Sequence, residues 1–399
     1  MNISLKRLAL GLASAGMLTI YGCGGGGSSD PTSTPSPTPA PATTPLPTPT
    51  AASGVAALPV SLISQPKAVN CAALRSGVYN FIVPSSAGIL TNQISKTTID
   101  AVALTATDSS GVTSFVASAG EACHFTTLNS TNGVNDMVVS PAGVIVFRGS
   151  DTATKEIGIG IPAQTYTTTD LDGDYNLIGM EKNNGVFNGK TVTATIKGGA
   201  VTAAKTCSNS TTWDVTAASC VVITSGFSKF TVNSDGGFNN VDPVDGITGR
   251  LFIYRSGSND TMGIMISQLG GITLLTNQRT YTLPTVGTTT VSWTLQLNNN
   301  LTSPTALSAT SNTVLSVDSV AGSWVRTNTT VGLNDTVNQT LFANNPRSGY
   351  RFRPAGSAVA TDGSTQTIRE VTSLEMYGMG LNVVLIPSVK RFQFSVTQP

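Results

Sequence analysis

The sequence has little charge and few of the side chains on which catalysis and nucleic-acid binding depend. Charged residues make up 11% of the chain, with 22 basic against 21 acidic side chains. A balance this close to neutral excludes the basic footprint of a nucleic-acid-binding protein. His124 is the single histidine, so any Ser-His-Asp triad would have to use it as the base. Gly-x-Ser-x-Gly and Cys-x-x-Cys are both missing, which removes the usual nucleophile elbow and the usual zinc-ligand pair.

Helical periodicity is also missing, because no apolar stripe of useful length follows residue 57. Thr, Ser, Asn, Gly and Val dominate instead, a mixture typical of short strands joined by turns. Residues 191–197 and 200–204, separated by Gly198-Gly199, form a hairpin pattern. Such signals predict an all-β protein built from repeated antiparallel sandwich-like or barrel-like units of about 100 residues. A propeller-like or solenoid stack is the alternative.

The first 23 residues carry a targeting pattern. Two basic residues at positions 6 and 7 precede an uncharged stretch, Leu8–Ile20, that is too short to span a bilayer. Residues 20–23 (Ile-Tyr-Gly-Cys) stand where a lipobox would, and the whole segment resembles the signal of a bacterial lipoprotein precursor. The resemblance implies that residues 1–22 form a signal peptide that is removed, and that Cys23 becomes a lipidated N-terminus.

The mature chain is predicted to be held to a membrane by lipid alone. It keeps 20 of the 22 basic side chains against 21 acidic ones, so it has no polybasic attraction to anionic lipid, and acyl chains on Cys23 would anchor it. Residues 23–57 are expected to be a disordered tether, since Pro31–Pro49 is rich in Pro, Thr and Ser. In lipoproteins of this kind Asp after the cysteine signals inner-membrane retention. Gly24 stands there instead, which implies the outer membrane.

The folded part contains an internal repeat. Residues 75–82 (Arg-Ser-Gly-Val-Tyr-Asn-Phe-Ile) match residues 171–178 (Leu-Asp-Gly-Asp-Tyr-Asn-Leu-Ile). Val146-Phe147-Arg148 matches Ile253-Tyr254-Arg255, and Tyr350-Arg351-Phe352-Arg353 stands for the same pair in a diverged third copy. These matches predict two or three repeated units. The expected boundaries are 58–169, 170–287 and 288–399.

Four cysteines remain once Cys23 is set aside. An even number in an exported protein predicts two disulfides, and four cysteines allow three pairings. Cys123 and Cys220 fall at matching positions of the first two copies, so each is expected to pair within its own copy. The favoured pairs are Cys71 with Cys123 and Cys207 with Cys220.

An acidic segment at the start of the second copy is a calcium candidate. Asp170, Asp172, Asp174 and Glu181 take positions 1, 3, 5 and 12 of a calcium loop. The sixth position is Tyr175, where such a loop needs glycine for its sharp turn. We therefore prefer a plain turn that enters a strand, and we expect no metal and no cofactor.

The remaining candidate chemistry is sparse. Cys123-His124 of the first copy corresponds to Cys220-Val221 of the second, which favours a structural strand position for His124 over a catalytic one. The sequence therefore favours a non-catalytic lipoprotein with a binding or structural role in the cell envelope, whose partners are the membrane and an envelope protein or glycan, and not nucleic acid. The alternative is a hydrolase of envelope polysaccharide or peptide that uses carboxylates from different strands.

Overall fold

The computed structural model describes ten ranges of the chain: residues 57–84, 93–127, 134–149, 156–183, 186–208, 220–243, 246–298, 303, 307–330 and 336–397. Cys23, the signal segment and nearly all of the expected tether lie outside these ranges. Within them, no helix has the length and hydropathy needed to cross a bilayer.

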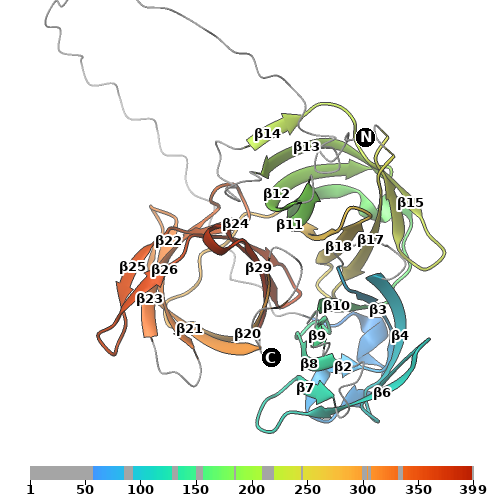
Figure 1. Cartoon of the computed structure of the whole chain (residues 1–399), viewed down its shortest axis with the longest axis horizontal. Helices are drawn as coiled ribbons and strands as arrows, with labels where there is room; N and C mark the ends of the chain where they lie inside the picture. Colours follow the sequence, from blue (N-terminus) through green and yellow to red (C-terminus); the bar gives the residue numbers. More distant parts are fainter. Residues whose placement is uncertain are drawn as a thin grey trace, which may run out of the picture.

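The first unit is a closed antiparallel barrel, drawn in blue to teal in Figure 1. A short helix, α1 (Val60–Ile63), and a ribbon of two strands, β1 (Lys67–Ala68) and β2 (Cys71–Arg75), precede it. The last strand of the barrel pairs with the first, which closes the ring. In ring order the strands are β3 (Gly77–Ile82), β4 (Ile94–Asp100), β5 (Thr105–Asp108), β6 (Gly111–Ala117), β7 (His124–Thr127), β8 (Val134–Val139), β9 (Ile145–Gly149) and β10 (Ile157–Pro162).

The second unit is also a ring of strands, entered through the 3-10 turn η2 (Thr168–Leu171). The β12–β13 hairpin turns at Gly198-Gly199, where both glycines have positive φ. At Ala200, β13 pairs with β15 and closes the ring, while β14 (Cys220–Ile223) pairs with the far end of β13 outside it. The ring strands are β11 (Gly173–Asn183), β12 (Val186–Lys197), β13 (Ala200–Ser208), β15 (Lys229–Val232), β16 (Phe238–Val241), β17 (Thr248–Arg255), β18 (Thr261–Ser267) and β19 (Gly271–Asn277).

The third unit is a closed barrel as well, drawn in orange to red in Figure 1. A separate hairpin, β25 (Gly356–Val359) and β26 (Thr365–Ile368), is inserted after β24, and the 3-10 turn η4 (Pro387–Val389) links the last two strands. The ring strands are β20 (Thr289–Leu297), β21 (Ser308–Asp318), β22 (Ser323–Thr330), β23 (Thr336–Ala343), β24 (Tyr350–Arg353), β27 (Val371–Met376), β28 (Leu381–Ile386) and β29 (Arg391–Thr397).

The predicted fold class is confirmed, since the described chain folds into antiparallel barrel-like units. In the described part of the chain the units are barrels, and these residues form neither a sandwich, a propeller nor a solenoid. Each ring has eight strands. A barrel of this size is either filled by side chains or just wide enough to hold one small ligand. Which of the two applies is decided by the inward-facing residues.

The repeat is looser in the structure than in the sequence. Tyr79 and Tyr175 are equivalent, because β3 and β11 both open their rings. Val146-Phe147-Arg148 lies on the seventh strand of its ring, whereas Ile253-Tyr254-Arg255 lies on the sixth. The match between these two aromatic–arginine pairs is therefore wrong. Because strands and loops differ in length between the units, the same number of residues can end on different strands of the ring.

The first two barrels are filled with apolar side chains. The interior of the first is packed by aromatic rings, among them Phe81 and Phe147 at 5.2 Å between centroids. Gly158 and Gly160 of β10 leave the room that these rings need: a Cβ at Gly158 would lie 2.2 Å from the Phe147 ring. The second barrel holds Tyr175 and a further apolar cluster from its own strands. A small apolar cavity of about 60 Å³ remains in the second interior. Both interiors are therefore packed mainly by apolar side chains.

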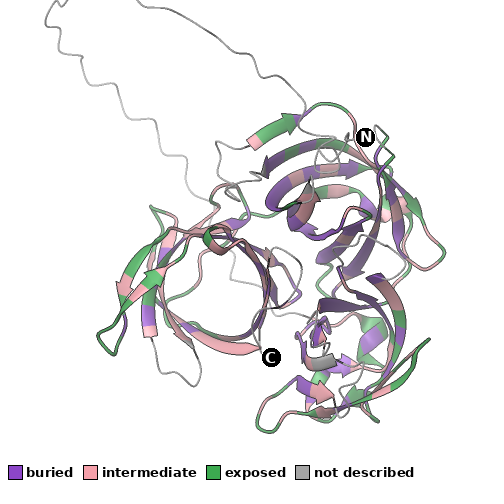
Figure 2. Cartoon of the chain, in the orientation of Figure 1, coloured by how far each residue is buried: buried purple, intermediate pink, exposed green. Residues whose placement is uncertain are grey.

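The outer faces of all three barrels meet in one apolar cluster, here called the shared cluster. Figure 2 shows buried segments concentrated where the barrels face one another. The members alternate along their strands, so that every second residue faces out of its own barrel and into the neighbours. They include Ile157, Ile159 and Ile161 of β10; Ile178 and Met180 of β11; Met262, Ile264 and Ile266 of β18; Trp293, Leu295 and Leu297 of β20; Leu381, Val383 and Leu385 of β28; and Phe392, Phe394 and Val396 of β29.

Buried tyrosines add polar links between the barrels. The Tyr254 hydroxyl of the second barrel donates to the carbonyl oxygen of Ala142 in the first. The Tyr350 hydroxyl of the third barrel lies 2.8 Å from the Leu177 carbonyl oxygen and 2.9 Å from that of Val192, both in the second. Because these groups are buried, each hydroxyl needs its partner.

Replacing Tyr350 with phenylalanine is expected to lower the free energy of unfolding by about 1 kcal/mol, since the one hydroxyl hydrogen shared between these two carbonyl oxygens is lost. Tyr377→Phe is the matched control, because the Tyr377 hydroxyl has no hydrogen-bond partner among the described residues. Thermal unfolding of both variants measures the difference. An equal loss of stability in the two would contradict the role given to the Tyr350 hydroxyl.

Two disulfides are present. Cys71 is bonded to Cys123, which ties the ribbon strand β2 to the residue just before β7. Cys207 is bonded to Cys220 and joins β13 to β14. Each bond lies within one barrel unit, although Cys123 and Cys220 do not occupy equivalent ring positions.

The Cys71–Cys123 bond is expected to contribute more to stability. It spans 52 residues of sequence, against 13 for Cys207–Cys220, and the chain-entropy model gives about 4 and about 3 kcal/mol respectively. The double variant Cys71→Ser/Cys123→Ser should therefore have the lower melting temperature of the two double variants under calorimetry. A larger loss from Cys207→Ser/Cys220→Ser would contradict this order.

Candidate functional site

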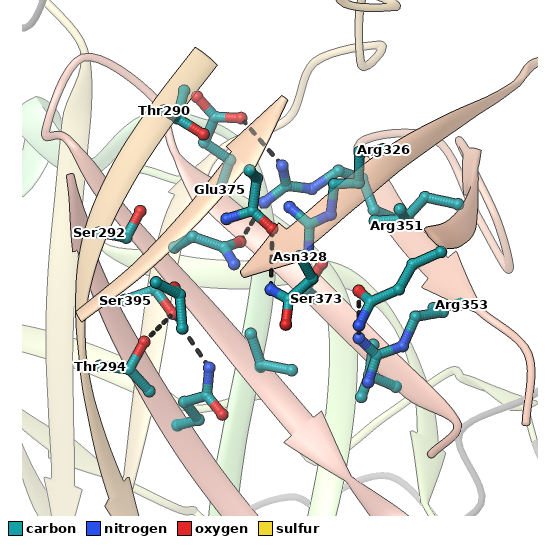
Figure 3. A pocket seen from close by; sticks show the side chains of 18 of the residues that line it. Thr290, Ser292, Thr294, Arg326, Asn328, Arg351, Arg353, Ser373, Glu375 and Ser395 are labelled. Carbon is teal, nitrogen blue, oxygen red and sulfur yellow. Dashed lines mark hydrogen bonds and ion pairs between the residues drawn. The ribbon is translucent and has the colours of Figure 1, made fainter. Parts of the chain in front are cut away.

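The third barrel differs from the other two because its lumen is lined mainly by polar side chains. A cavity of about 580 Å³ runs along its interior, a size typical of pockets for small molecules. Figure 3 shows serine, threonine, asparagine and arginine side chains projecting into it from several strands. The lining residues on which the argument depends are Thr290, Ser292, Thr294, Arg326, Asn328, Gln339, Arg351, Arg353, Ser373, Glu375, Asn382 and Ser395.

Strand alternation explains why this lumen is polar. In β20 the residues Ser292, Thr294 and Gln296 line the cavity, while Trp293 and Leu295 between them enter the shared cluster. Strand β29 repeats the pattern, with small polar residues inward and aromatic residues outward. The apolar side of each strand is thus used on the outside of the barrel, which leaves the polar side for the inside.

Arginines line the cavity from two further strands of the ring, β22 and β24. Arg351 and Arg353 lie two apart on β24, and Arg326 on β22 is directly paired with Gln339 of the strand between them. The Arg353 side chain donates to the Gln339 side-chain oxygen at 2.7 Å and to the Arg369 carbonyl oxygen at 3.1 Å. Strands β22 to β24 therefore present a cationic wall to the lumen (Figure 3).

Glu375 is the one carboxylate among the described residues that line the cavity. Its Oε2 lies 3.7 Å from Nη1 of Arg351. Arg351 also donates to the Asn382 side chain and, at 3.3 Å, to the Tyr281 hydroxyl. Burial opposes the charge of Arg351, but Tyr281 and Glu375 outweigh it and raise the pKa of Arg351 above its ordinary value. Arg351 is therefore a fixed, paired cation.

Arg326 has no such partner. The described part of the structure contains no hydrogen bond or ion pair from its side chain, and its Nε is buried and unpaired. Burial, with repulsion from Arg351 and Arg353, lowers the pKa of Arg326 to about 9. Burial and repulsion from Arg369 likewise lower the pKa of Arg353 to about 10. Both side chains still carry their charge at neutral pH, in surroundings that disfavour it.

The calcium candidates are not brought together. Asp170 accepts bonds from the backbone N–H and hydroxyl of Thr167, each at 2.7 Å, and caps η2. Asp172 accepts from the Gly198 N–H at 2.6 Å, and Asp174 accepts from the Thr195 hydroxyl. Glu181 lies 2.7 Å from the Lys190 ammonium. Within the described ranges no group of three acidic, histidine or cysteine side chains is placed to hold a metal.

His124 lies at the junction between the first and third barrels. Its Nδ1 is bonded to Glu121, its Nε2 is 3.4 Å from Asp136, and its ring centroid is 4.8 Å from that of Trp293. Burial opposes protonation, but the hydrogen bonds to Asp136 and Glu121 outweigh it and raise the pKa of His124. With a carboxylate at each ring nitrogen, His124 is placed to join two barrels as a cation rather than to activate a nucleophile.

Sequence reasoning missed the arginine wall. Arg351 and Arg353 were noted only as a repeat of an aromatic–arginine pair, and Arg326 carried no motif. The available signal was the alternation Thr-x-Ser-x-Thr-x-Gln over residues 290–296. That pattern predicts a strand with one polar face, but it does not say that the polar face points into a closed ring.

Comparisons with known proteins assign neither a family nor a function. No protein-family model and no curated protein matches the chain. A DUF3598-family protein of unknown function from Nostoc punctiforme aligns with 59% of this chain and 99% of its own, at 9% identity and a TM-score of 0.21. A transferrin binding protein B variant from Haemophilus parasuis covers 81% of this chain and 76% of its own, at 8% identity and 0.22. The Neisseria meningitidis protein of that name has a TM-score of 0.18.

The stability of the barrel junction is expected to depend on pH through His124. Because the pKa of His124 is raised in the folded chain, its contribution is complete below the unfolded value of about 6.5 and is lost as the pH rises through the folded value. The melting temperature should therefore fall as the pH rises above about 6.5. His124→Gln should flatten this dependence in a pH series of thermal unfolding. A slope that is the same in both proteins would refute the assignment.

Proposed function

We propose that the mature chain is a non-catalytic binding lipoprotein of the bacterial cell envelope, anchored in the outer membrane through Cys23, and that the lumen of the third barrel is its binding site for a small polar molecule. The observation that carries the proposal is the contrast between the barrels. Two interiors are packed mainly by apolar side chains, the second with a small apolar cavity of about 60 Å³, while the third holds a cavity of about 580 Å³ lined mainly by polar ones.

The hydrolase alternative has less support at this site. A two-carboxylate mechanism needs a pair of acids about 5 to 10 Å apart, and Glu375 is the single acid among the described lining residues. Glu375 also lies against Arg351. Binding without chemistry is therefore the function that this lumen supports best.

A lumen-blocking variant tests the proposal. The chain is extracted from its own envelope in mild detergent and examined by native mass spectrometry, where a small-molecule adduct is expected on the wild-type chain. Ser292→Trp should abolish the adduct, because Ser292 lines the cavity and a large ring there would fill it. Val320→Trp is the matched control, since Val320 is almost fully exposed in the turn after β21.

The anchor is tested in the same preparation. Cys23→Ser should move the chain from the membrane fraction to the soluble fraction and leave lumen occupancy unchanged, because the anchor and the barrel act separately. The proposal fails if the adduct persists in Ser292→Trp or is lost equally in Val320→Trp. Inner-membrane fractionation of the wild-type chain would contradict the outer-membrane location.

A further inference from the structure

We infer that the ligand of this lumen is a hydroxyl-rich small molecule that carries an oxyanion, a carboxylate or a phosphate monoester. The inference rests on the proposed function and names the class of ligand for the same site. Three observations support it: the excess of cationic side chains in the lining, the lack of a partner for Arg326 among the described residues, and the hydroxyl side chains on β20 and β29.

The described lining is strongly cationic. Arg326, Arg351 and Arg353 face the cavity and Arg369 lies exposed among the lining residues, against Glu375 as the one acid. Glu375 is placed against Arg351 and leaves the other guanidinium groups without a carboxylate. An excess of cations inside a closed ring raises the local concentration of anions and excludes small cations. The ligand must therefore bring negative charge.

Arg326 marks the place where that charge is needed. Its guanidinium has no hydrogen-bond or ion-pair partner within the described ranges, and Arg353 next to it is held by the neutral Gln339. An unpaired cation inside a protein costs stability unless an anion completes it. A planar carboxylate or a phosphate can accept two parallel N–H bonds from such a guanidinium. Arg326 is thus placed as the anchor for the oxyanion.

The opposite wall is neutral and rich in hydroxyls. Strands β20 and β29 lie four ring places from β24 and β23, and they present Thr290, Ser292, Thr294 and Ser395 to the cavity. These side chains both donate and accept hydrogen bonds, which suits a body of alternating hydroxyl groups. The cavity is also far larger than a bare phosphate ion requires. A sugar acid or a sugar phosphate has both the negative charge that pairs with Arg326 and a body of hydroxyl groups.

Calorimetric titration of the mature chain tests the inference with glucuronate, glucose 6-phosphate, glucose and inorganic phosphate as probes. At least one of the two sugar acids should bind about tenfold or more tightly than glucose, the size expected of a charge-assisted hydrogen-bond pair. Arg326→Gln should remove this preference. Lys229→Gln, which takes one positive charge from an exposed position on β15 of the second barrel, should retain it.

The outcomes separate the two proposals. Tighter binding of glucuronate alone assigns a carboxylate, and tighter binding of glucose 6-phosphate alone assigns a phosphate. Equal binding of glucose and both acids, unchanged in Arg326→Gln, overturns the oxyanion and leaves lumen binding intact. Inorganic phosphate binding as tightly as glucose 6-phosphate overturns the hydroxyl-rich body. If no probe binds and the purified chain carries no adduct, both proposals fall.

Discussion

The shared apolar cluster is the constraint on which the rest of the structure depends. It buries outward-facing side chains from all three barrels, and each large aliphatic residue so buried contributes about 1.5 to 3 kcal/mol. The third barrel therefore needs only small apolar clusters in its own interior. That arrangement leaves room for a cavity lined mainly by polar side chains, whereas the interiors of the first two barrels are packed mainly by apolar side chains.

A half-buried guanidinium without a partner among the described residues is the clearest sign that the lumen serves something other than stability. Burial and the neighbouring arginines oppose the charge of Arg326 and lower its pKa. Two arginines of the second barrel are in contrast paired with carboxylates: Arg255 with Asp170, and Arg250 with Asp235. Sites that tolerate such a cost are commonly binding sites, where the ligand supplies the missing interaction.

Much of the architecture could be read from the sequence, and the site could not. Short Val- and Thr-rich runs with glycine turns predicted antiparallel barrel-like units, and the hairpin around Gly198-Gly199 forms as expected. The predicted equivalence of the aromatic–arginine pairs was wrong, because the number of residues between two motifs does not give the number of strands between them. The polar lumen could not be predicted, because the alternation in β20 identifies a polar and an apolar face but does not show which of them points into the barrel. That choice is made by the neighbouring barrels, which cover the apolar face.

The period of two along β24 has a consequence for how such a protein can change. Tyr350 faces the second barrel and Arg351 faces the lumen, although they are adjacent in sequence. Along β24, the outward-facing residues hold the barrels together, and the inward-facing residues determine what the lumen can bind. Substitutions at inward positions can alter what the lumen accepts without disturbing the surfaces that hold the barrels together. A family of chains with one scaffold and many specificities could arise from this barrel by exchange of every second residue.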